Sequence, residues 1–175
     1  MGKIFLIALF VVSVVACKKG NTNANDNRND TVAVNTIVAT IGDSTYTFNK
    51  KAFDTLYVQD PANNGLDELE LKAFLDTSVN ATGFSILIFS SDVDTAKTYS
   101  EYNYYTEGFG NMYYTLNNKY TFDADGESQL NPVTVTVTSI LSTSIKGTFK
   151  GDIHLNGYID SAKVVVTNGK FNFRK

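Results

Sequence analysis

VTVTVT, at residues 133–138, carries only valine on one face of an extended chain and only threonine on the other. A second stretch, IKGTFKGDIHL at residues 145–155, alternates apolar residues and glycine with Lys, Thr, Asp and His. Both stretches have a period of two, which predicts strands that bury one face and expose the other. These two segments indicate an antiparallel β-sheet in the C-terminal third of the chain.

Strand-like segments of the same kind cover the chain from Ile37 onward. Residues 37–41 and 44–48 flank Gly42-Asp43 and predict a hairpin. Residues 69–73 alternate apolar and charged residues but also contain good helix formers; we favour a strand, since 85–89 would pair with it. Further strands are expected at 52–58, 164–166 and 171–173, with a turn at Asn156-Gly157 and a bulge or tight turn at Asn168-Gly169. The pattern predicts an all-β antiparallel β-sandwich, with a closed antiparallel β-barrel as the alternative.

The N-terminal segment has the layout of a secretory signal. A basic start at Lys3 precedes an apolar run over residues 4–16, and Cys17, the only cysteine, follows at once. The run is too short for a membrane helix, which needs roughly 20 residues. A cysteine directly after Ala16 resembles the lipobox of bacterial lipoproteins. This resemblance implies that residues 1–16 are removed and that Cys17 carries lipid chains, which hold the protein to a membrane.

Residues 17–36 are expected to form a flexible tether, because asparagine recurs there and large apolar residues are absent until Val32. Such a coil has a mean reach of about 25 Å. Residues 37–175 are long enough for a single all-β domain. Without residues 1–16 the chain has 14 basic and 18 acidic residues, a net charge of −4, which argues against nucleic acid as a partner. One cysteine excludes an internal disulfide.

Two C-terminal segments carry a family resemblance. They are IKGTFKG at residues 145–151 and VTNGKFN at residues 166–172. They resemble the closing strands of small uncharacterised β-rich lipoproteins of Bacteroidota. The resemblance implies a lipid-anchored protein of the outer membrane and brings no activity or catalytic residues with it. Surface-exported members often carry acidic residues after the cysteine, whereas this chain has Lys18 and Lys19, so the periplasmic and surface faces both stay open.

Tyrosines are concentrated between residues 99 and 120. The candidate ligand-binding residues are Tyr99, Tyr102, Tyr104, Tyr105, Tyr113 and Tyr114, with Tyr120 closing the stretch. A tyrosine ring suits stacking on sugars or anchoring a protein interface. The alternative is that these are inward and cross-strand residues of β-strands, where tyrosine is favoured.

Asp123, Asp125 and Glu127 surround Gly126 and resemble the opening of a calcium loop, with oxygen ligands at alternate positions. The bidentate Glu that closes an EF-hand loop is missing, since Thr134 stands there. A hairpin turn is the alternative, because Asp-Gly is a common turn pair. No other cofactor is expected.

His154 is the only histidine, and the alternation places it on the polar, solvent-facing side of its strand. No nucleophile motif accompanies it, so a catalytic triad is not predicted. Carboxylates remain for a glycan hydrolase, and their separation cannot be derived from sequence. The available ones are Asp92, Asp94, Glu101, Glu107, Asp123, Asp125 and Glu127.

The bacterial setting implied by the resemblance adds one modification. Bacteroidota attach O-glycans at Asp-(Ser/Thr)-aliphatic-type tripeptides, and five similar tripeptides occur. Their acceptor residues are Thr31, Ser44, Thr55, Thr95 and Ser161. β-Turn chemistry also favours Asp-Ser and Asp-Thr pairs.

The sequence as a whole predicts a membrane-anchored lipoprotein of the cell envelope that is not an enzyme. Its expected role is a non-catalytic binding or accessory module for a glycan or a protein partner. A structural envelope component without a ligand site is the first alternative, and a carboxylate-based glycan hydrolase is the second. The membrane, reached through the lipid on Cys17, is the expected partner in each case.

Overall fold

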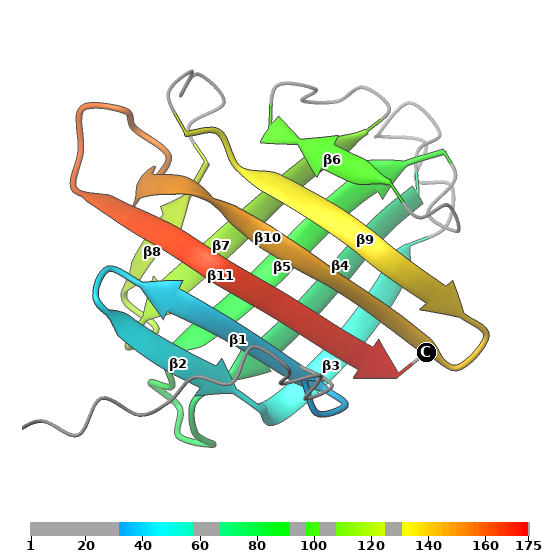
Figure 1. The fold of residues 1–175 in the computed structure, drawn as a ribbon. Helices are drawn as coiled ribbons and strands as arrows, with labels where there is room; N and C mark the ends of the chain where they lie inside the picture. The colour runs from blue at the N-terminus through cyan, green and yellow to red at the C-terminus, as the bar shows by residue number, and fades with distance from the viewer. Residues whose placement is uncertain (1–31, 58–66, 92–96, 102–107, 125–130, 175) are drawn as a thin grey trace, which may run out of the picture. The chain divides into compact units, whose positions relative to one another are not determined.

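The structure, a computed structural model, describes residues 32–57, 67–91, 97–101, 108–124 and 131–174 (Figure 1). The chain divides into two compact units, Met1–Asp30 and Thr31–Lys175, and every described residue belongs to the second. The regular elements of this described part are all β-strands. Nowhere in these ranges is there a helix with the length and apolarity needed to cross a membrane.

Eleven strands follow one another along the chain. They are β1 (Thr36–Ile41), β2 (Ser44–Phe48), β3 (Lys50–Tyr57), β4 (Asp67–Phe74), β5 (Gly83–Ser90), β6 (Thr98–Ser100), β7 (Phe109–Leu116), β8 (Tyr120–Asp123), β9 (Thr134–Leu141), β10 (Ser144–Leu155) and β11 (Lys163–Arg174). The segment around residues 69–73 is a strand, as favoured, since β4 pairs with β5 along its whole length. The predicted hairpin around Gly42 is the β1–β2 pair.

The strands lie in two layers, and the predicted all-β, sandwich-like architecture is confirmed. Figure 1 shows a front layer in the order β2-β1-β11-β10-β9 and a rear layer in the order β7-β5-β4-β3. Two short strands link the layers: β6 pairs with β9 and β7, and β8 pairs with β7 and β10. All pairs are antiparallel except β6–β7. These links close a ring through β7, β6, β9, β10 and β8, whereas in the described part no pairing joins the end strands β2 and β3.

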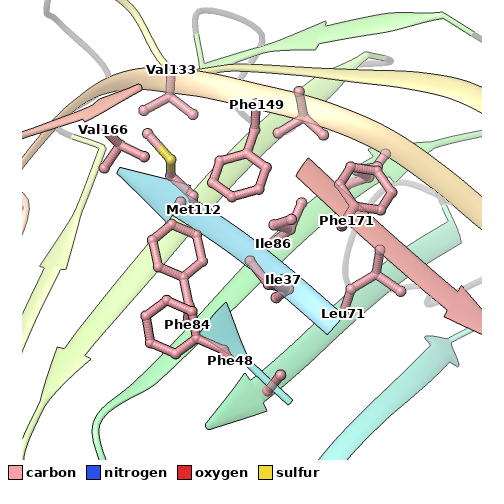
Figure 2. Packing of buried hydrophobic residues seen from close by; sticks show 14 of the residues in the cluster. Ile37, Phe48, Leu71, Phe84, Ile86, Met112, Val133, Phe149, Val166 and Phe171 are labelled. Atoms are coloured by element: carbon pink, nitrogen blue, oxygen red, sulfur yellow. The ribbon is translucent and has the colours of Figure 1, made fainter. Parts of the chain in front are cut away.

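The core between the layers is apolar and rich in aromatic rings (Figure 2). Phe84 of β5 in the rear layer and Phe149 of β10 in the front layer lie with ring centroids 5.1 Å apart. Phe48 extends this contact on one side, and Phe171 extends it on the other. The alternating apolar faces seen in the sequence therefore meet in a single core.

The alternation of β10 breaks at Gly151, and the prediction of a solvent-facing His154 is wrong. A register shift lies between Phe149 and Gly151, and Gly151 has a φ of +142°, which favours glycine. A Cβ on Gly151 would lie 2.6 Å from Val133 Cα, so the chain before β9 runs closely against β10 here. Beyond this point both faces of β10 are covered, and His154 is only 4% exposed.

Candidate functional site

The outer face of the front layer carries a surface groove of about 290 Å³. Its lining comes from three adjacent strands: Thr134 and Thr136 of β9; Thr148, Phe149 and Lys150 of β10; and Asn168, Gly169 and Lys170 of β11. The polar side chains among these project outward because their strand neighbours fill the core. The sheet, whose inner face packs against the core, thus presents hydroxyl, amide and ammonium groups on one concave surface.

Strand register fixes the positions of the groove residues. Thr148 stands directly opposite Thr136 on β9 and opposite Lys170 on β11. The Thr136 hydroxyl lies 2.9 Å from the Thr98 hydroxyl of β6, which extends the polar row by one strand. Lys150, which is exposed, stands opposite Thr134. The groove therefore has hydroxyl groups at its centre and an ammonium group on each of two neighbouring strands.

The candidate tyrosines do not form one surface. Tyr99 is fully buried, and Tyr114 packs against Phe84 and Phe122 in the core, where burial raises the pKa of its hydroxyl. For these two residues the alternative of inward strand residues applies, since their rings lie within the core. Tyr113 is half-buried on the outer face of β7. Tyr102, Tyr104 and Tyr105 lie outside the described residues.

Asp123 is the one predicted calcium ligand that the structure describes. It is half-buried at the end of β8, and a Cβ on Gly157 would lie 3.2 Å from its Oδ1. Burial raises the pKa of Asp123 to about 6. Asp125 and Glu127 lie outside the described residues. Within the described ranges, no group of three or more His, Cys, Asp or Glu residues is arranged to hold a metal ion.

The predicted modification sites lie in different surroundings. Ser44 is exposed at the start of β2. Ser161 is half-buried, and its hydroxyl donates to the Leu155 carbonyl at 2.9 Å. Thr55 lies in β3, where only the backbone is described. Thr31, Thr95 and the lipidation site Cys17 lie outside the described residues.

The structure also contains a row of polar residues, two of them buried (Asp152 and His154), that the sequence did not predict. His154 of β10 stands between Asp123 of β8 and Lys163 of β11 in register. Asp152 forms an ion pair with Lys163 at 2.8 Å and accepts a hydrogen bond from Asn131 Nδ2 at 2.6 Å. Gly151 was the available signal, because a glycine inside an alternating strand marks a bulge.

Of the other hydrolase candidates, Glu101 is fully buried at the end of β6, whereas Asp92, Asp94 and Glu107 lie outside the described residues.

No family model, curated protein or solved structure matches this chain. Only the chemistry of its own residues therefore bears on its function.

Proposed function

We propose that this chain is a lipid-anchored, non-catalytic binding module of the cell envelope, and that the groove over β9, β10 and β11 receives a glycan. The observation that carries the proposal is the concave row of hydroxyl, amide and ammonium groups on the outer face of the sheet. Such groups can form hydrogen bonds with the hydroxyl groups of a sugar. The aromatic core behind them holds the strands in place, so little conformational entropy is lost on binding.

The composition of the groove favours binding over catalysis. Its described lining contains threonine, lysine, asparagine, glycine and one phenylalanine, and it contains no carboxylate, imidazole or thiol. Those three groups are the usual general acids, bases and nucleophiles of hydrolytic sites. Asp152 lies elsewhere, beyond the Gly151 bulge, and its carboxylate is held by Lys163 and Asn131.

The proposed anchor is the lipid on Cys17. Each buried methylene contributes about 0.8 kcal/mol, so two or three acyl chains on one residue give an effectively permanent attachment. The domain is then confined to the membrane surface, where even a weak ligand site is effective because the local concentration is high.

The test uses the full-length chain in four forms: wild type, Cys17→Ala, Thr148→Trp and Thr47→Trp. Thr148 lies at the centre of the groove, whereas Thr47 is exposed on β2, outside it. Membrane fractionation of cells tests the anchor, and detergent-solubilised protein on a glycan array tests binding. We expect wild type in the membrane fraction and Cys17→Ala released from it. We expect Thr148→Trp to weaken glycan binding about tenfold, a loss of about 1.4 kcal/mol, and Thr47→Trp to bind normally.

Three outcomes would contradict the proposal. If Cys17→Ala stays in the membrane fraction, the lipid anchor is wrong. If wild type binds no glycan, or if both tryptophan variants bind like wild type, the groove is not a glycan site. The alternative of a structural envelope component would then be favoured.

A further inference from the structure

We infer that the groove selects an acidic glycan, in which carboxylate, phosphate or sulfate groups are attached to sugar rings. This inference rests on the proposed function, because it names the class of ligand for the same groove. Three observations carry it: the placement of two lysines, the distribution of charge between the two layers, and the position of the only aromatic ring in the lining.

Two lysines border the hydroxyl row at short range. Lys170 stands opposite Thr148 on the neighbouring strand, and Lys150 is two residues along β10 on the same face. Neighbouring strands are about 5 Å apart, and positions two residues apart on one strand are about 7 Å apart. Both ammonium groups can therefore reach one anionic substituent, or two on adjacent sugars, while the threonine hydroxyls contact the ring. Charge-assisted hydrogen bonds of this kind are about twice as strong as neutral ones.

Charge is unevenly distributed between the layers. The strands of the front layer carry five basic residues and one acid: Lys146, Lys150, Lys163, Lys170 and Arg174, against Asp152. Among the rear-layer residues whose side chains the structure describes, the charges balance: Lys50 and Lys72 against Glu68 and Glu70. The single acid of the front layer is neutralised by its ion pair with Lys163.

This distribution is opposite in sign to the net charge of the chain, which is −3. The excess of basic residues on the front strands is therefore a local property of these strands and is not a consequence of overall composition. A face of one sign raises the local concentration of ligands of the opposite sign and speeds their association. An acidic glycan is attracted to this face, and a neutral one is not.

The groove does not offer a stacking surface for a neutral sugar. Phe149 is the only aromatic residue in its described lining, and the residue is 3% exposed because its ring packs against Phe84 and Phe171 in the core. Binding therefore depends on hydrogen bonds and charge. Hydrogen bonds alone compete poorly with water, which leaves the two lysines as the main source of affinity.

The experiment measures binding of the full-length Cys17→Ala chain to three probes: polygalacturonate, which carries carboxylates, neutral dextran, and vesicles containing phosphatidylglycerol. The double variant Lys150→Gln with Lys170→Gln is compared with Lys119→Gln, a matched change at an exposed position in the turn between β7 and β8. We expect binding to polygalacturonate that weakens as NaCl rises from 50 to 200 mM. We expect about a tenfold loss in the double variant, because two exposed charge contacts are each worth up to about 1 kcal/mol. Lys119→Gln should bind like wild type.

The outcomes separate this inference from the proposed function. Equal binding of dextran and polygalacturonate, without salt dependence, would overturn the acidic-ligand inference and leave the glycan site standing. Binding to the vesicles alone would also overturn it, because the basic face would then be a lipid-binding surface. A loss with Lys119→Gln as large as with the double variant would show that the groove is not the site. Failure to bind any sugar here or on the glycan array would remove the proposed function itself.

Discussion

Burial changes the ionisation of Asp123. Its Oδ1 is buried and receives no hydrogen bond from the described residues, and burial raises its pKa to about 6. Tyr113 of β7 and His154 of β10 stand opposite it in register, with Lys163 and Asp152 beyond. The charged form is disfavoured because the carboxylate is partly removed from water.

The raised pKa gives a pH-dependent stability. A group whose native pKa lies above its unfolded value contributes stability at low pH and loses it as the pH rises through the native value, here about 6. We therefore predict that Asp123→Asn raises the Tm at pH 7.5, where the native Asp123 carboxyl is ionised. This gain should shrink at pH 4.5, where that carboxyl is mostly protonated in the native wild type. Differential scanning calorimetry at the two pH values measures both effects. Asp43→Asn, in the exposed β1–β2 turn, is the control; a gain from Asp123→Asn that is equal at both pH values would contradict the prediction.

Single residues also show where burial could not be predicted from the sequence. The alternation correctly assigned Ile145 and Phe149 to the core, but it failed at His154 because the Gly151 bulge and the chain at 131–133 cover that end of β10. Tyr99 and Tyr114 occur in the same tyrosine-rich stretch as Tyr113, yet they are core residues. A local pattern predicts which face of a strand is buried only while the pleat is regular. It does not show which distant segments of the chain cover the other face.

At the scale of strands, the sequence predicted where most strands lie along the chain, but it said much less about which strands pair with each other. The alternating stretches at residues 133–138 and 145–155 form β9 and β10, which pair with each other. The roles of β6 and β8 as links between layers had no local signal, since these strands span few residues and find partners far along the chain. The groove could not be predicted for the same reason: it combines β9, β10 and β11 through register.

Close packing of β10 between its neighbours leads to a prediction at Gly147. A Cβ there would overlap the Phe171 ring and the backbone oxygen of Thr136, and the backbone atom cannot move aside cheaply. Gly147→Ala should therefore lower the free energy of unfolding by about 1–3 kcal/mol, the usual cost of overpacking. Urea denaturation measures it. Thr148→Ala, the outward neighbour, should change stability by about 0.5 kcal/mol or less; equal costs at the two positions would mean that β9 and β11 are not so close to β10.

At the scale of the whole molecule, the two layers differ in charge but share one core. The rear layer supplies Phe84, and the front layer supplies Phe149 and Phe171 (Figure 2). Composition and alternation predicted an all-β sandwich correctly because apolar faces of many strands must be buried against each other. The strand order could not be derived, since the same faces could be buried in several orders.

A shared core predicts that the layers unfold together. Phe149→Ala removes a buried ring in contact with rings of both layers, so the free energy of unfolding should fall by about 3–5 kcal/mol. Tyr158→Ala removes an aromatic ring that is 70% exposed and should leave stability nearly unchanged. Far-UV circular dichroism reports the strands, and tyrosine fluorescence reports tertiary packing, because the chain has 10 tyrosines and no tryptophan. The two signals should give one urea midpoint for each protein, shifted down in Phe149→Ala. Separate midpoints would mean that the layers are independent units, and the backing that we assign to the groove would then be absent.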